Sequence, residues 1–292
     1  MKFGYILPNF GDKITAEELV EISRVCEEVG FDSVWATDHI IMPAELREPY
    51  GQLLEPLVTL SFVAAATEKV RVGTSIIVLP QRNPILLAKQ AAALDVFSRG
   101  RLILGVGAGW AEREFQYLNA DFRRRGSVFD ESIRLIRKLW ADEVVDFEGR
   151  YFSVRGAVFL PKPVQKQIPI WIGGTTESAV MRAVRLGDGW HPVGLDVEAF
   201  RRGAEAVRRH GRDLTLSIRM TVDVRKKREP YVAATGERRA VVSGSRKEII
   251  AQIEAYREAG LQYFCASVLH PRAEDIIADL RKFSSEIIGS YS

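Results

Sequence analysis

The segment that most constrains the fold is residues 70–110, in which two apolar strand-like runs flank one helical pattern. The first run, residues 70–79, is rich in β-branched side chains and leads to Asn83 and Pro84, a capping residue followed by a first-turn proline. The helical pattern ends at Gly100, and a second apolar run follows directly. A helix that joins two strands over about 40 residues makes a crossover between parallel strands, and both faces of such a sheet are buried.

The same alternation of strand-like runs and helical patterns continues through the chain. The strand-like runs are residues 1–8, 33–37, 70–79, 101–106, 168–174, 189–193, 214–224 and 262–269. No linker-like change of composition separates them, so we predict an α/β protein, a single domain over residues 1–292 that folds as a (β/α)₈ TIM barrel. The rhythm is interrupted by predicted insertions after strands 2, 4 and 7, at residues 40–56, 142–163 and 225–244.

Capping signals indicate where individual helices begin. Thr15 with Glu18 has the pattern of a capping box. Helices are also predicted to begin at Thr175 and, near the end of the chain, at Pro271. Residues 111–126 are charged and have no steady period, so we expect them to be irregular.

Composition excludes several classes of protein. Hydrophobic residues make up 47% of the chain and charged residues 27%, no apolar run is long enough to span a membrane, and the N-terminus lacks a signal-peptide layout. We therefore expect a cytoplasmic protein with no membrane partner. The formal net charge of +3 is too small to indicate nucleic acid binding. The two cysteines, Cys26 and Cys265, and the four histidines show no metal-ligand spacing.

Residues that follow the strand-like runs are candidate site residues, because the active site of a TIM barrel lies at the carboxyl ends of the strands. Asp38 and His39 follow the second run. A histidine there can transfer protons near neutral pH, whereas the alternative is a loop histidine bonded to a backbone carbonyl. His191 is either a ligand contact or a strand-end residue with a structural role. Asn9 and Trp110, also near strand ends, are predicted to line a substrate pocket.

Two glycine-rich turns are further candidates. Gly173 and Gly174 leave backbone N–H groups unobstructed where Thr175 opens a helix, an arrangement that holds a phosphate. The alternative is an ordinary glycine pair in a loop. The run at residues 105–109 has the form GxGxG, but it lacks the third glycine of a dinucleotide-binding fingerprint and follows the fourth strand.

Four segments carry a resemblance to a known family: WATDHIIMP, GTSIIVLPQRNPILLAKQAAALDVFSRGRLILGVGAGWAEREF, RRGSVFDESIRLIRKLW and IPIWIGGTTESA. With them the chain resembles the luciferase-like monooxygenase superfamily, and in particular its shorter branch that uses the deazaflavin coenzyme F420. The resemblance spans nearly the whole chain. It implies a (β/α)₈ barrel with insertions that holds its cofactor at the strand ends, and a homodimer.

The resemblance also implies roles for single residues. A non-proline cis peptide bond in the family's third strand matches Ser75–Ile76, and the phosphate contacts match the turn at residues 173–175. His39 matches a histidine near the reacting face of the deazaflavin-dependent sugar-phosphate dehydrogenases. The predicted cofactor-binding residues, with His191 added from its place at a strand end, are Asp38, Ser75, Ile76, Gly107, Ala108, Gly173, Gly174, Thr175 and His191.

One departure from the family bears on the substrate. The sugar-phosphate dehydrogenases carry a glutamate where this chain has Trp110, which indicates a more apolar pocket. We predict an oxidoreductase that moves a hydride between the deazaflavin C5 and a small organic, apolar substrate, with His39 as the proton donor or acceptor. One alternative is an FMN-dependent two-component monooxygenase supplied by a separate cofactor reductase. The other is a noncatalytic barrel that binds a flavin.

Basic clusters occur at residues 123–125, 208–212 and 225–228. Such clusters usually form solvated faces of a protein. Because F420 ends in a polyglutamate tail, a cluster close to the barrel mouth is a candidate contact for that tail.

Overall fold

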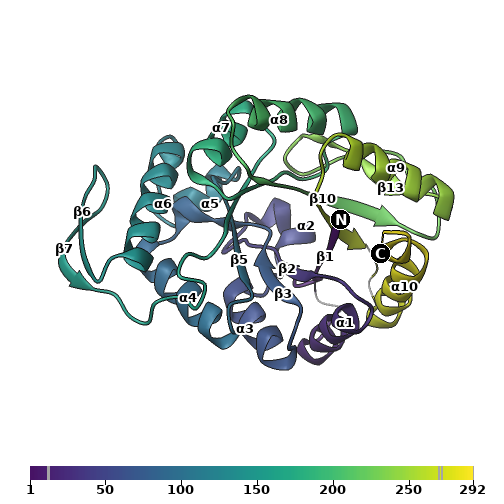
Figure 1. Ribbon diagram of the computed structural model, residues 1–292, viewed down its shortest axis with the longest axis horizontal. Helices are drawn as coiled ribbons and strands as arrows, with labels where there is room; N and C mark the ends of the chain where they lie inside the picture. The colour runs from purple at the N-terminus through teal and green to yellow at the C-terminus, as the bar shows by residue number, and fades with distance from the viewer. Residues whose placement is uncertain (12–13, 269, 271, 292) are drawn as a thin grey trace.

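The computed structural model describes residues 1–11, 14–268, 270 and 272–291. Within them, eight parallel strand positions close into a barrel, because the last strand pairs with the first (Figure 1). In order around the barrel the strands are β1 (Lys2–Ile6), β2 (Ser33–Ala36), β3 (Arg71–Thr74) continued by β4 (Ile77–Val78), β5 (Leu102–Gly107), β8 (Ile170–Gly173), β9 (Gly189–His191), β10 (Thr215–Asp223) and β14 (Tyr263–Val268). The predicted TIM barrel is confirmed.

Helices connect successive strands and cover the outside of the barrel (Figure 1). They are α1 (Ala16–Glu28), α3 (Pro56–Ala66), α4 (Pro84–Phe97), α6 (Arg125–Ala141), α7 (Glu177–Leu186), α8 (Val197–Arg209), α9 (Arg246–Glu258) and α10 (Ala273–Glu286). The capping box predicted for α1 is present, because the Glu18 backbone N–H donates to Thr15 Oγ1 and the Thr15 backbone N–H donates to the Glu18 carboxylate.

Two local predictions differ from the structure. Thr176, and not Thr175, caps α7, since its hydroxyl accepts the backbone N–H of Ala179. The segment predicted to be irregular contains the helix α5 (Glu112–Tyr117) and the start of α6. A helix of six residues is too short to show a helical period in the sequence. The predicted start of the last helix at Pro271 lies outside the described residues.

The predicted insertions are present. The first contains the 3₁₀ turn η1 (Ala44–Leu46) and α2 (Arg47–Tyr50), the second an antiparallel hairpin of β6 (Val144–Glu148) and β7 (Ser153–Val158), and the third a hairpin of β11 (Tyr231–Val232) and β12 (Arg238–Arg239) followed by β13 (Val241–Ser243). The β6–β7 hairpin projects away from the barrel (Figure 1). The remaining short 3₁₀ turns are η2 (Leu79–Gln81) and η3 (Ile288–Ser290).

The barrel interior is a packed core and not a pore. Its buried side chains are Ile6, Trp35, Ile103, Trp171, Tyr263 and Cys265. The Trp35 ring fits there because Gly73 has no side chain, and a Cβ at Gly73 would overlap the ring. Any ligand must therefore bind above this core, at the carboxyl ends of the strands.

The third strand is interrupted where it reaches the barrel rim. Ser75 and Ile76 separate β3 from β4, and the peptide bond between them is cis, as the resemblance implies. The Ile76 side chain packs against Gly107 and Gly173, where an added Cβ would crowd it, and a Cβ at Gly105 would overlap the Thr74 carbonyl oxygen. The glycines of β5 and β8 therefore make room for this interruption.

We predict that Gly105→Ala destabilises the fold by at least about 3 kcal/mol, because the new methyl group meets a backbone carbonyl that is held within the sheet. The control is Gly289→Ala, whose Cβ would have its nearest neighbour, the Ser284 carbonyl oxygen, at an ordinary contact distance of 3.8 Å. Chemical denaturation of the purified variants measures both changes. Equal stability of the two variants would contradict this account of the glycine.

Candidate active site

A cavity of about 650 Å³ opens at the carboxyl ends of the barrel strands, within the range of about 300–1,000 Å³ typical of small-molecule sites. The predicted site residues that line it are Asp38, His39, Ser75, Ile76, Gly107, Ala108, Trp110, Gly173, Gly174, Thr175 and His191. They come from segments far apart in the sequence. Residues that were predicted from strand ends and from the family resemblance therefore lie around one cavity.

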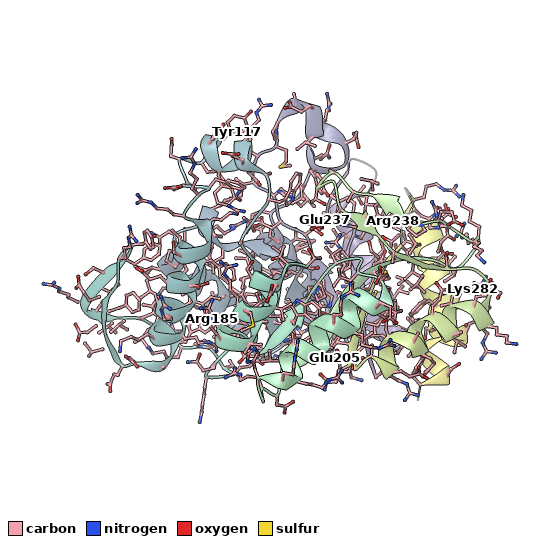
Figure 2. All side chains as sticks on the ribbon, turned by 90° about the horizontal axis from the view of Figure 1, so that it is seen from above. Tyr117, Arg185, Glu205, Glu237, Arg238 and Lys282 are labelled. Carbon is pink, nitrogen blue, oxygen red and sulfur yellow. The ribbon has the colours of Figure 1, made fainter. Side chains whose placement is uncertain are left out.

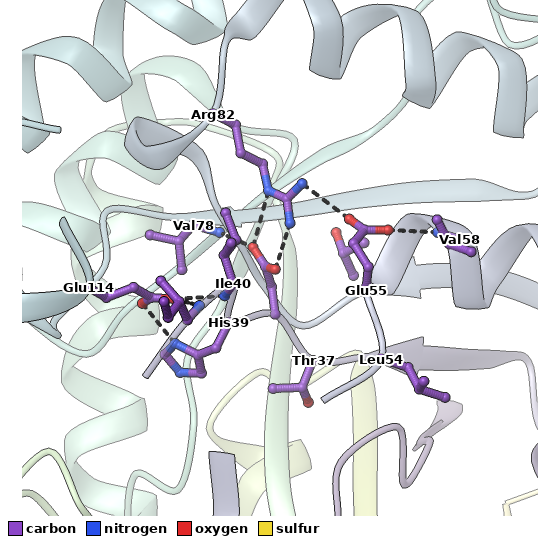
Figure 3. Close-up of polar contacts among 12 residues, drawn as sticks. Thr37, His39, Ile40, Leu54, Glu55, Val58, Val78, Arg82 and Glu114 are labelled. Atoms are coloured by element: carbon purple, nitrogen blue, oxygen red, sulfur yellow. Dashed lines mark hydrogen bonds and ion pairs between the residues drawn. The ribbon is translucent and has the colours of Figure 1, made fainter. Parts of the chain in front are cut away.

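His39 and Glu114 form a buried pair on the wall of the cavity. Nδ1 of His39 lies 2.9 Å from a Glu114 carboxylate oxygen, and only 7% and 1% of the two side chains is exposed. The other carboxylate oxygen accepts the backbone N–H of Ile40 at 2.7 Å (Figure 3). Since a carboxylate only accepts, Nδ1 of His39 carries the proton and Nε2 is left for a ligand.

The pKa of Glu114 reflects this pairing. Burial by itself would raise the pKa of a carboxyl group, but the hydrogen bond and charge of His39 outweigh it, and the pKa of Glu114 is lowered below its ordinary value of 4.5. Glu114 is therefore ionised at neutral pH. A charged carboxylate at this position accepts Nδ1–H and fixes the orientation of the His39 ring.

Asp38 is held by partners within the protein. Its carboxylate accepts the backbone N–H of Val78 at 2.9 Å and an Arg82 guanidinium N–H at 2.7 Å. Arg82 also reaches Glu55 at 3.1 Å (Figure 3). Asp38 thus joins the end of β2 to β4 and to the turn that precedes α4, and this network fixes the loop that carries His39.

His191 is buried and neutral. Burial, with a contribution from the charge of Arg219, lowers its pKa to about 3. The Ser217 hydroxyl donates to the Trp190 carbonyl, so it accepts from Nδ1 of His191 at 2.8 Å. Nε2 of His191 consequently accepts the Ser75 hydroxyl at 3.0 Å. His191 holds Ser75 in place and does not serve as an acid at neutral pH.

An aromatic wall stands beside His39. The His39 ring lies 5.8 Å from Trp110 in an edge-on arrangement and 4.8 Å from Tyr50, which belongs to α2. Both aromatic residues line the cavity. The placement of Trp110 agrees with its predicted position in the pocket, and Tyr50 was not anticipated from the sequence.

The turn at residues 173–175 faces a carboxylate. The Thr175 hydroxyl donates to Glu237 at 2.9 Å, and both residues line the cavity. Gly174 has a φ of 121°, a conformation that favours glycine. The proposed phosphate contact at this turn would therefore require Glu237 to release Thr175.

Asn9 does not line the cavity, which corrects its assignment to the substrate pocket. Its side chain is 2% exposed, and its amide donates to the carbonyls of Thr37 and Leu54 and accepts the Thr37 backbone N–H. Asn9 has a structural role because all of these partners are backbone groups of the neighbouring loops.

Two basic regions also line the cavity. Arg219 of β10 and Arg239 of β12 lie in one, and Arg123 and Arg125 belong to the first of the three basic clusters in the sequence. The clusters at residues 208–212 and 225–228 do not contribute to the lining that the described residues form.

Sequence reasoning missed Glu114, Arg82 and Arg219. Each is a charged residue whose importance depends on a partner far away in the chain, with separations of 75 residues for Glu114 and His39 and 44 for Arg82 and Asp38. No local signal marks Glu114 in the sequence, because α5 is too short to show a helical period and the burial of Glu114 and Phe115 appears only in the structure.

No three histidine, cysteine, aspartate or glutamate side chains of the described residues gather in a way that would hold a metal ion. Over the same part of the chain, none of the helices combines the length and the apolar character needed to cross a membrane.

Comparison with known proteins places these features in context. The luciferase-like monooxygenase family matches residues 1–259. An F420-dependent glucose-6-phosphate dehydrogenase of Amycolatopsis mediterranei is 30% identical, and the match covers 95% of this chain and 97% of that protein.

Solved structures share the fold at lower sequence identity. An F420-dependent secondary alcohol dehydrogenase, solved with an F420–acetone adduct, aligns with a TM-score of 0.81 at 22% identity and covers 98% of each chain. The monooxygenase RslO1 of Streptomyces bottropensis aligns with a TM-score of 0.83 at 21% identity over the full length of both chains. At such identities the likeness concerns the fold alone.

We predict that Glu114→Gln lowers the free energy of unfolding by about 2 kcal/mol at pH 7, since a charge-assisted hydrogen bond is lost in a buried place. The pKa of Glu114 is lower in the folded protein, so its contribution is present above its unfolded pKa and disappears as the pH falls below 4.5. Denaturation at a series of pH values measures the difference from the wild type.

The control for this prediction is Glu112→Gln, which changes an exposed carboxylate on the same helix. It should leave the stability unchanged at every pH. A difference between wild type and Glu114→Gln that stays constant from pH 7 to below 4 would show that the carboxylate charge is not the stabilising feature.

Proposed function

The chain belongs to the luciferase-like monooxygenase family, and from that premise we propose that it is an F420-dependent oxidoreductase that moves a hydride between the deazaflavin C5 and a small organic substrate. The observation that carries the proposal is the His39–Glu114 pair, which presents Nε2 of His39 to a cavity at the barrel mouth. The F420-dependent glucose-6-phosphate dehydrogenase that the chain matches over 95% of its length supports the choice of cofactor.

The cavity has features that suit a flat, ring-shaped cofactor. Its volume is that of a small-molecule site, and Gly107, Ala108, Gly173 and Gly174 line it beside the Ser75–Ile76 interruption. The residues that would hold the cofactor are those of the prediction that line the cavity: Asp38, Ser75, Ile76, Gly107, Ala108, Gly173, Gly174, Thr175 and His191.

F420, when bound, supplies the hydride acceptor or donor at C5. The protein supplies the proton transfer. In the oxidation of an alcohol, Nε2 of His39 would take the proton from the hydroxyl oxygen while the hydride leaves the carbon that bears this hydroxyl. In the reduction of a carbonyl, the protonated Nε2 would return the proton to the oxygen. Glu114 holds Nδ1–H throughout, so that the imidazolium formed at His39 faces a carboxylate 2.9 Å away.

Two alternatives remain open to experiment. An FMN-dependent two-component monooxygenase would use the same barrel. The oxygenating constituent of 3,6-diketocamphane monooxygenase, solved with FMN, aligns with a TM-score of 0.76, so the fold does not separate the two cofactors. A noncatalytic flavin-binding barrel would not need the buried Glu114 that orients His39, and the pairing favours catalysis over this alternative.

The expected homodimer, the separate cofactor reductase and the cytoplasmic location stay predictions. Exposed apolar side chains on the adjacent helices α3 and α4, among them Phe62, Leu86 and Phe97, give a second copy of the chain a surface to cover.

The contact of Arg123 and Arg125 with the polyglutamate tail of F420 also stays a hypothesis, supported by their place at the cavity.

We predict that the purified protein binds F420 with micromolar or tighter affinity and binds FMN much more weakly. Titration of the same preparation with each cofactor, followed by the change in cofactor fluorescence, measures both dissociation constants. Micromolar or tighter binding of FMN without binding of F420 would replace our proposal with the monooxygenase alternative.

We predict that His39→Asn lowers turnover by about 10²- to 10⁴-fold while the dissociation constant of F420 stays nearly unchanged, because the variant removes the proton-transferring group and leaves the cofactor contacts in place. Reduction of F420 by glucose 6-phosphate and by secondary alcohols, compounds named for the matched proteins, provides the assay. His210→Asn changes an exposed histidine next to α8 and serves as the matched control. Undiminished turnover of His39→Asn would remove His39 from the mechanism.

A further inference from the structure

Arg219 is a cation at the cavity wall that has no acidic partner. It extends from β10, and its Nη1 donates to Thr37 Oγ1 at 3.0 Å and to the Ser75 carbonyl oxygen at 2.8 Å. Both partners are neutral, and no ion pair joins Arg219 to a carboxylate of the described residues. The other guanidinium N–H groups of Arg219 are thus available to a ligand in the cavity.

Arg239 brings a second cation to the same region. Only 15% of its side chain is exposed, and its Nε is buried without a hydrogen-bond partner. The carboxylate of Glu237 lies 3.9 Å away, beyond hydrogen-bond distance, and Glu237 already accepts the Thr175 hydroxyl. Glu237 thus forms a long ion pair with Arg239, and Nε of Arg239 remains free to bind a ligand.

The two guanidinium groups influence each other. Burial lowers the pKa of Arg219 to about 10, and the positive charge of Arg239 is the next contribution to this shift. Arg182, which also lines the cavity, differs because it is paired with Asp130 at 2.8 Å. Arg219 has no carboxylate partner among the described residues, and Arg239 has only the distant Glu237, so an anion that enters the cavity would stabilise both cations.

We propose that Arg219 and Arg239 form a subsite for an anionic group of the substrate, a carboxylate or a phosphate. This inference rests on the proposed function, because it assigns the rest of the cavity to the cofactor. The place of Arg219 favours the substrate as the source of the anion. Arg219 donates a hydrogen bond to Thr37, which precedes His39 by two residues in the sequence. The predicted phosphate contact of the cofactor, in contrast, lies at residues 173–175.

Arg239 and Arg219 reach the cavity from different parts of the fold. The hairpin of β11 and β12 lies on the side of the molecule that also carries Tyr117 of α5, as the labelled Glu237 and Arg238 show (Figure 2). Arg239 belongs to this insertion and Arg219 to the barrel itself. A ligand anion would therefore bind the two together.

The subsite changes the expected substrate class. Trp110 and Tyr50 indicate a substrate with an apolar part, and the pair of arginines favours a negative charge on the same molecule. The substrate class that satisfies both is a small organic acid or phosphate ester with an apolar body and an alcohol or carbonyl near His39. An uncharged lipophilic substrate would leave Arg219 without an acidic partner and Arg239 with only its long ion pair to Glu237.

Inorganic phosphate is the first probe, and thermal unfolding is a readout that needs no cofactor. At constant ionic strength, phosphate in place of chloride should raise the Tm of the wild type in a saturable way, as expected for a ligand of the folded state. Arg219→Gln and Arg239→Gln should each weaken this binding by about 10- to 100-fold. Arg155→Gln, which alters a side chain that is 82% exposed on β7, should leave it unchanged.

Arg239→Gln decides the test if Arg219→Gln does not fold, because Arg239 lies outside the barrel and its Nε makes no hydrogen bond. If phosphate still raised the Tm of Arg239→Gln as it does for the wild type, the proposed subsite would be overturned. The same holds if Arg155→Gln lost the rise in Tm to the same extent as Arg239→Gln.

A second measurement distinguishes the substrate from the cofactor as the source of the anion. Wild type and Arg239→Gln are titrated with F420 and with its phosphate-free deazaflavin riboside. Unchanged affinity of the variant for both compounds supports a substrate subsite. A loss that affects F420 but not the riboside would assign the arginines to the cofactor phosphate and overturn the proposal. Failure of the wild type to bind F420, with the phosphate effect intact, would overturn the proposed cofactor and support the anion subsite.

Discussion

The site depends on the packing of residues 74–76 against glycines of the neighbouring strands. Ile76 lies against Gly107 and Gly173, and the Thr74 carbonyl oxygen lies where Gly105 would carry a Cβ. A side chain at any of these glycines would push the interrupted strand away from β5 and β8. The glycines at residues 105 and 107 are thus explained by the close contact of their backbone with Thr74 and Ile76 of the neighbouring strand. A bound cofactor would meet the surface that this strand forms.

The same interruption organises the charged groups around it. Ser75 donates its hydroxyl to His191 and accepts Arg219 at its carbonyl oxygen, so that one residue connects β9 and β10 to the third strand. The pKa of about 3 keeps His191 neutral beside the positive charge of Arg219. Because His191 and Arg219 both hold Ser75, the rim of the barrel is rigid where a ring-shaped ligand would lie, and rigid support is what precise hydride transfer requires.

The parts of the site that could be predicted are those with a local signal. Strand ends are visible in the sequence, so Asp38, His39 and the glycine turns were found from their positions alone. Arg219 could not be found in this way, because its partner Thr37 is 182 residues away and becomes a neighbour only when the barrel closes. Asn9 shows the opposite error, since a polar residue at a strand end can also serve the loops beside it.

Glu114 shows how a helix too short to be predicted supplies the partner of a distant histidine. The helix α5 brings the carboxylate of Glu114 to Nδ1 of His39, 75 residues away in the sequence. A carboxylate at Nδ1 orients the ring and leaves Nε2 free, while Trp110 lies edge-on to the same ring. The orientation of His39 and the apolar character of the pocket beside it therefore depend on different residues.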